Sequence, residues 1–181
     1  MVKHAARLGV LILTLWGVAA VMAQAPAGPP QPGPEHKKLA YFVGKWTSEA
    51  ELKPSPFGPG GKYLATETCE WFAGGFSLVC HSEGKGPMGE LKGISIMGYD
   101  PGEKTYLYFE SNNFGENDFS RGTVEGDTWT WNAEGKMDGK AVRMRFTLKQ
   151  VSADSSTYRF EMASGVAPFT LVMEGKQTRL K

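Results

Sequence analysis

Apolar and polar residues alternate in short runs from Trp46 almost to the end of the chain. The run at 141–151 shows this most clearly, with apolar side chains at Val142, Met144, Phe146 and Leu148 and polar or basic residues between them. Such alternation is typical of a β-strand with one buried face. About ten runs of this kind occur, separated by turn signals such as Asp100-Pro101-Gly102-Glu103. The pattern predicts an all-β fold, either an antiparallel barrel or a sandwich.

One short helix is expected before the strands. Leu39, Phe42 and Val43 recur at helical spacing within 35–43, and Gly44 follows as a candidate C-cap. After Gly44 no long helical period appears. The last expected strand covers 169–174, with Phe169, Leu171 and Met173 on one face.

The first 23 residues have the organisation of a secretory signal peptide. Basic Lys3 and Arg7 precede an apolar stretch over 8–21, and the small residues Val21 and Ala23 suit cleavage after Ala23. The alternative is an uncleaved anchor, but the apolar stretch is shorter than the ~20 residues that span a membrane. We therefore expect an exported protein, periplasmic or secreted, without a membrane anchor after cleavage.

A proline-rich tether is expected over 24–34, ahead of a single domain over 35–181. The tether is either a plain spacer or a proline motif for a partner. The whole chain has 20 Lys and Arg against 19 Asp and Glu, and no basic cluster. This near-neutral balance argues against nucleic acid and anionic membrane surfaces as partners. The sequence identifies no protein partner.

The two cysteines, Cys69 and Cys80, flank a predicted hairpin. A two-residue loop at Gly74-Gly75 places them opposite each other, which predicts a cross-strand disulfide. That register makes them a hydrogen-bonded pair, whose Cα atoms are farther apart than at alternate positions, unless a longer loop or a bulge intervenes. The alternative is a redox pair, but close Cys-x-x-Cys spacing and nearby positive charge are missing.

Three segments carry a family resemblance: HKKLAYFVGKW at 36–46, KGISIMGYDPGEKTYLY at 92–108 and KQTRLK at 176–181. The chain resembles an uncharacterised family of small exported bacterial proteins, grouped with the calycins, which include lipocalins, fatty-acid-binding proteins and nitrobindin-type haem proteins. The resemblance implies a closed or nearly closed antiparallel lipocalin-like barrel of about ten strands with a short N-terminal helix. It also implies that Arg179 lies over the ring of Trp46, as a structural contact.

Candidate chemistry is sparse. His36 is expected in solvent and His81 on a strand, and no later histidine could serve as the axial haem ligand that nitrobindin-like proteins use. No His and Cys set has metal-ligand spacing. We therefore assign no catalytic residue, cofactor or metal. An enzyme would need Glu110, Glu70 or His81 to point into a cavity beside another titratable group.

Aromatic residues are the remaining candidates for function. Small-molecule cavities are lined largely by aromatic and aliphatic groups. The candidate ligand-binding residues are Trp71, Tyr106, Tyr108, Trp129 and Trp131. These side chains either line a cavity or fill an ordinary core. The first functional hypothesis is binding of a small apolar or amphipathic molecule, and the alternative is a ligand-free exported interaction module. A cavity of at least ~300 Å³ would favour the first hypothesis.

Overall fold

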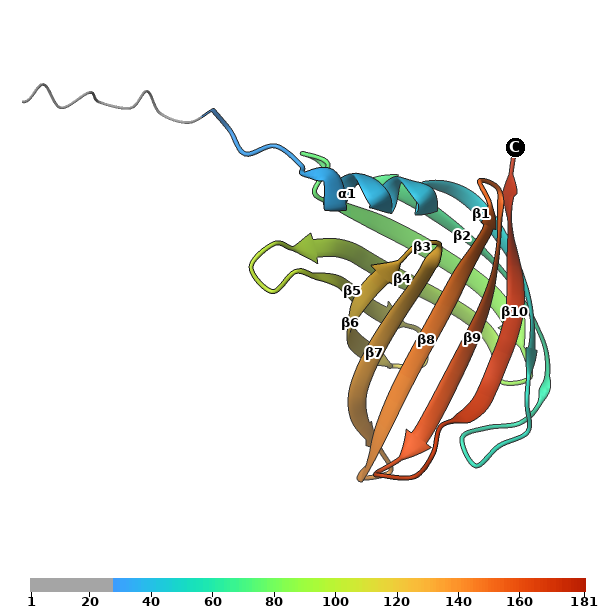
Figure 1. The fold of residues 1–181 in the computed structure, drawn as a ribbon. Helices are drawn as coiled ribbons and strands as arrows, with labels where there is room; N and C mark the ends of the chain where they lie inside the picture. Colours follow the sequence, from blue (N-terminus) through green and yellow to red (C-terminus); the bar gives the residue numbers. More distant parts are fainter. Residues whose placement is uncertain (1–27) are drawn as a thin grey trace, which may run out of the picture. The chain divides into compact units, whose positions relative to one another are not determined.

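The computed structural model describes residues 28–181 (Figure 1). The expected signal peptide at 1–23 and the first four residues of the expected tether lie outside the described residues. Residues 28–33 have no regular secondary structure, and Pro34, expected at the end of the tether, is the first residue of a helix. The described residues contain no helix with the length and hydropathy of a membrane span.

Ten antiparallel strands form a closed barrel, which confirms the expected fold (Figure 1). Each strand pairs with the next along the chain, and β1 pairs with β10 to complete the ring. The strands are β1 (Gly44–Leu52), β2 (Gly61–Trp71), β3 (Ser77–Gly86), β4 (Gly89–Asp100), β5 (Thr105–Asn112), β6 (Asn117–Glu125), β7 (Thr128–Met137), β8 (Lys140–Ser152), β9 (Ser155–Ser164) and β10 (Thr170–Leu180).

The strand β10 differs from the sequence expectation in two ways. It extends to Leu180, beyond the expected end at residue 174. The sequence does not indicate this extension, because the inner positions after Met173 are Gly175, Gln177 and Arg179 and give no apolar alternation. Its pairing with β9 also shifts between Leu171 and Met173. A β-bulge of this kind reverses which residues face inward, so Leu171 and Met173 do not share a face as expected.

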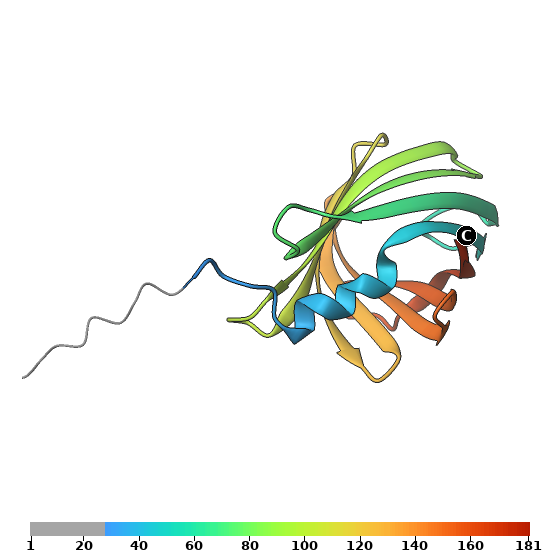
Figure 2. The same cartoon turned by 90° about the horizontal axis from the view of Figure 1, so that it is seen from above.

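A helical segment covers one end of the barrel (Figure 2). It consists of α1 (Pro34–Lys38) followed by a 3₁₀ turn, η1 (Leu39–Phe42), which agrees with the expected helix. Leu39 and Phe42 are buried, and the ring of Phe42 packs edge-on against that of Trp129, with 5.0 Å between ring centres. We call this end the capped end.

The structure corrects the expectation for His36. Its side chain is only 8% exposed and packs edge-on against the rings of Phe76 and Tyr99. Its Nδ1 atom accepts a hydrogen bond of 3.2 Å from the backbone N–H of Gly33. The histidine therefore fixes the start of α1 against the barrel, instead of facing solvent.

The disulfide between Cys69 and Cys80 is confirmed, and the two residues are directly opposite on β2 and β3. The hairpin loop is longer than expected, because Phe72 donates its N–H to the carbonyl of Ser77 and leaves four residues in the loop. The longer loop leaves the same residues opposite each other. It exchanges the two types of pair, however, so that Cys69 and Cys80 become a non-hydrogen-bonded pair instead of the expected hydrogen-bonded one. The cysteine Cα atoms are 4.0 Å apart, in keeping with the closer, non-hydrogen-bonded type of pair.

Candidate ligand cavity

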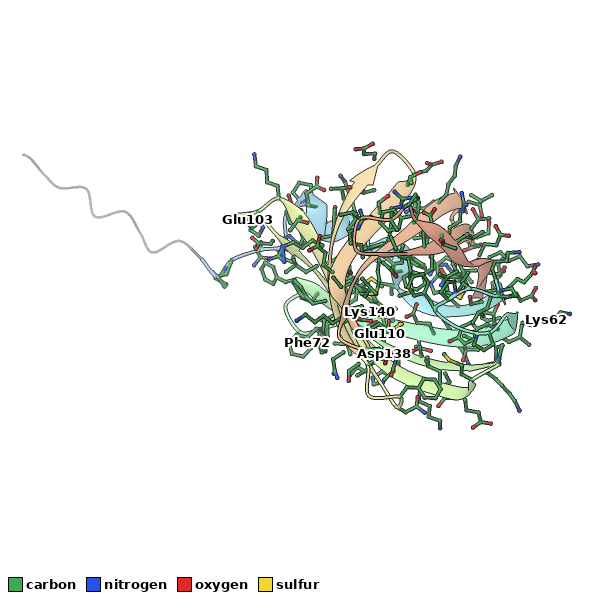
Figure 3. All side chains as sticks on the ribbon, turned by 90° about the horizontal axis from the view of Figure 1, so that it is seen from below. Lys62, Phe72, Glu103, Glu110, Asp138 and Lys140 are labelled. Carbon is green, nitrogen blue, oxygen red and sulfur yellow. A yellow bond between two sulfur atoms is a disulfide. The ribbon has the colours of Figure 1, made fainter. Side chains whose placement is uncertain are left out.

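The barrel encloses a cavity of about 810 Å³. Phe42 and Trp46 line it toward the capped end. Phe57, Met88 and Phe114 line it at the opposite end, on the connections β1–β2, β3–β4 and β5–β6. We call this opposite end the open end, and Figure 3 views the barrel from that side. The volume lies within the range of ~300–1,000 Å³ that is usual for small-molecule sites.

One wall of the cavity is mainly apolar. It is formed by strands β8, β9 and β10, whose inward side chains include three methionines and two phenylalanines. Its apolar lining residues are Val142, Met144, Phe146, Leu148, Phe160, Met162, Val172 and Met173, and the same strands contribute two polar lining residues, Tyr158 and Gln177. Methionine side chains are flexible and polarisable, so such a wall can adapt to apolar groups of different shapes.

The facing wall carries polar and acidic groups from β2, β5 and β6. On β2 the odd-numbered residues face inward, and Glu67 lines the cavity while Lys62 points away from the barrel (Figure 3). Glu110 on β5 pairs with Asp118 on β6, and both line the cavity. The wall therefore brings together carboxyl groups that are far apart in the sequence.

The electrostatics of Glu67 and Glu110 follow from their enclosure. Burial, with a smaller contribution from the nearby Glu110 carboxyl, raises the pKa of Glu67 to about 7. Burial also raises the pKa of Glu110 above its ordinary value, although a hydrogen bond from Tyr108 acts in the opposite direction. A carboxyl group with a pKa near 7 can take up or release a proton at neutral pH.

Tyr108 connects the acidic groups to the aromatic part of the cavity. Its hydroxyl donates a hydrogen bond of 2.9 Å to Oε2 of Glu110. Burial raises the pKa of Tyr108 well above its usual range, and the two nearby carboxyl groups add to that effect. The hydroxyl therefore stays protonated and acts as a hydrogen-bond donor.

Four of the five aromatic residues singled out from the sequence are linked by ring contacts, including stacked Trp129 and Trp131, but they do not all line the cavity. Tyr108 and Trp131 line the cavity, with 6.3 Å between their ring centres. Tyr106 and Trp129 are buried in the core cluster with Phe42, and their rings lie 4.7 Å apart. Trp71 ends β2 and is 38% exposed.

Of the groups considered for catalysis, Glu110 lies in the cavity, whereas Glu70 and His81 are exposed. Sequence reasoning missed Glu67, because the stretch Thr66-Glu67-Thr68 is polar throughout and does not mark an inner face. In the described residues, the grouping compact enough for a metal comprises Glu67, Cys69 and Cys80. The two sulfur atoms are bonded to each other, so this grouping does not offer a metal site.

Comparison with known proteins agrees with this architecture. A family described as "Protein of unknown function (DUF1579)" matches residues 31–179. The chain belongs to this family. A comparison of this DUF1579 member with curated proteins gave no match.

Two solved structures show the same fold as this DUF1579 chain. Rv2717c from M. tuberculosis is 14% identical with a TM-score of 0.59, and the match covers 83% of this chain and 100% of that one. The S-type phycobiliprotein lyase CPES from Guillardia theta is 13% identical with a TM-score of 0.58, covering 81% and 93% of the two chains. At such low identity the likeness concerns the fold alone.

Proposed function

We propose that this chain is an exported binding protein that holds a small apolar or amphipathic molecule inside its barrel. The observation that carries the proposal is the cavity of about 810 Å³, which exceeds the ~300 Å³ expected of a ligand site. Its apolar wall suits a hydrophobic body, and its polar wall suits a polar group on the same molecule. The disulfide is in keeping with an oxidising compartment outside the cytoplasm.

A direct test is dye binding with a variant that fills the cavity. Ala133 lines the cavity on β7, so Ala133→Phe adds a ring inside the barrel. Ala141 is exposed on β8, and Ala141→Phe is the matched control outside it. The neutral dye N-phenyl-1-naphthylamine should fluoresce with the unmodified protein and with the control, and much less with Ala133→Phe. Equal fluorescence from both variants would place the dye outside the cavity and contradict the proposal.

Native mass spectrometry of the protein purified from its own host gives a second test. A co-purifying small molecule, absent from Ala133→Phe, would support a binding protein. A bare chain that also fails to bind the dye would reject it.

An alternative function is that of an exported interaction module without a ligand. A group of three large apolar side chains on the outer face favours this alternative, because exposed apolar patches often mark interaction sites. Ile96, Phe109 and Phe119 form this group, directly opposite one another on β4, β5 and β6. They are between 38% and 48% exposed. The test is the same dye experiment: absence of dye binding in the unmodified protein would leave this outer face as the stronger candidate.

A further inference from the structure

The cavity holds buried carboxyl groups without basic partners. Among the described residues, the Glu67 carboxyl has no hydrogen bond or ion pair, and the Glu110 carboxyl accepts hydrogen bonds from two neutral groups, the Tyr108 hydroxyl and the Asn112 side chain. Two basic residues are part of the described lining, Lys53 and Lys136. Lys53 forms ion pairs of 3.3 and 3.0 Å with Glu51 and Glu174, and Lys136 is one residue from the end of β7 at the open end.

A buried serine on β4 lies beside these carboxyl groups. Ser95 is 4% exposed and pairs with Cys80 on one side and Glu110 on the other, on the inward-facing register of β4. Its Oγ lies within reach of the Tyr108 hydroxyl. Buried polar groups without partners, such as the Glu67 carboxyl, are uncommon in folded proteins and mark places where a missing partner would bind.

The missing partner is better matched by an organic cation than by a metal ion. A metal needs several ligand atoms around one point, and the compact grouping found in the described chain is blocked by the Cys69–Cys80 bond. The cavity is also far larger than an ion and has an apolar wall opposite the carboxyl groups. A molecule that combines a positive charge with an apolar body would satisfy both walls.

We propose that the ligand carries a basic nitrogen group held by Glu67 and Glu110, with its apolar part against Met144, Met162 and Met173. This inference rests on the binding function proposed above. The ammonium group would relieve the repulsion between the two carboxylates and occupy their free acceptor positions. An anionic ligand of the same shape would be repelled by them.

The assignment has a consequence for pH dependence. The titratable groups around Glu67 are Glu110 and Tyr108 on β5, Tyr63 on β2 and Tyr158 on β9, and none of them is basic. Because the pKa of Glu67 is raised to about 7, the carboxyl is protonated at slightly acid pH. It must lose this proton before it can form an ion pair with a cation. Affinity for an amine should therefore increase as the pH rises through this value, while affinity for a neutral ligand should not.

The experiment displaces N-phenyl-1-naphthylamine with decylamine, decanol and decanoate, which share one apolar chain and differ in charge. We expect decylamine to bind about tenfold or more tightly than decanoate near neutral pH. Its affinity should rise between about pH 6 and pH 8, where decylamine itself stays charged. Glu67→Gln and Glu110→Gln should each weaken decylamine binding about tenfold and leave decanol binding unchanged. Glu70→Gln, on an exposed side chain of the same strand, is the matched control and should change neither.

The outcomes separate the two proposals. If the dye binds but decylamine shows no preference over decanoate, or none that depends on Glu67 and Glu110, the amine assignment is wrong and the binding function stands. If the dye does not bind to the folded, unmodified protein, the binding function itself is wrong.

Discussion

The guanidinium carbon of Arg179 lies 4.2 Å from the centre of the Trp46 ring. The two residues are directly opposite each other where β10 meets β1 and the barrel closes. The same guanidinium donates hydrogen bonds to the carbonyl oxygens of Tyr41 and Val43, and to the carboxylate of Asp154. The indole N–H of Trp46 donates a 3.0 Å hydrogen bond to Phe42. The pair thus joins the strand closure to the helical segment at the capped end.

Trp46→Ala should lower the stability of the barrel. Trp46 is 3% exposed, so the change removes a large buried ring and leaves Arg179 without its aromatic partner. We expect a loss of about 3–5 kcal/mol in the free energy of unfolding, measured by chemical denaturation. Trp71→Ala is the control, because Trp71 is 38% exposed and its loss should cost much less. Equal losses in the two variants, or an unchanged melting temperature in Trp46→Ala, would contradict this structural role.

The disulfide between Cys69 and Cys80 should contribute about 2–4 kcal/mol to stability, because it restricts the unfolded chain. The variant Cys69→Ala with Cys80→Ala should therefore unfold at a lower denaturant concentration. Reduction of the disulfide in the unmodified protein should produce a similar shift. The reductant should reach the bond only when the protein is unfolded, since the two cysteines are 1% and 0% exposed. Rapid reduction of the folded protein by a mild thiol would show that the bond is accessible, against the structure.

Gly122 on β6 should not tolerate a side chain. A Cβ atom at this inward position would lie 2.6 Å from Cδ1 of Trp131 and 2.9 Å from the backbone oxygen of Thr130. Gly122→Ala should therefore cost about 1–3 kcal/mol and displace the Trp131 ring, which lines the cavity. Gly135→Ala is the matched control, since its nearest neighbour would be 3.6 Å away. Thermal unfolding, with tryptophan fluorescence as the signal, would detect a difference between the variants, and equal stability would refute the expected clash.

The sequence predicts the barrel well because its strands have one apolar inner face and clear turn residues. At β8 the alternation through Val142, Met144, Phe146 and Leu148 corresponds to inward positions along the strand. The pairing of Cys69 with Cys80 is predicted equally well. The two-residue loop expected from the sequence and the four-residue loop in the structure are centred on the same point between Gly74 and Gly75, so both place the same residues opposite each other. The end of β10 is not predicted from the sequence, because its inward residues Gly175, Gln177 and Arg179 give no apolar alternation.

The candidate site is harder to predict, since it depends on which strands approach each other across the barrel. Tyr106 and Tyr108 share one strand face, yet the first is buried beneath the helical segment and the second lines the cavity. Glu67 lies in the polar stretch Thr66-Glu67-Thr68, and Glu110 follows a run with apolar or aromatic residues on both faces, so alternation does not distinguish inner from outer positions for either. Their proximity follows from the register of β2 through β5, which is a property of the closed sheet.

Glu67 should also make the stability of the ligand-free protein depend on pH. The pKa of Glu67 is raised to about 7 in the folded chain from an ordinary value of 4.5, so the folded state favours the protonated form. The contribution of Glu67 to stability is therefore complete when the pH is below its ordinary pKa of 4.5. As the pH rises through the raised pKa of about 7, the free energy of unfolding falls by as much as about 3 kcal/mol. Glu67→Gln stays neutral, so its advantage in melting temperature over the unmodified protein should be small near about pH 4.5 and largest near about pH 8. Glu70→Gln should show no such trend, because Glu70 is exposed. An advantage for Glu67→Gln that is independent of pH, or that is larger in acid, would mean that Glu67 is not held protonated by its burial in the barrel.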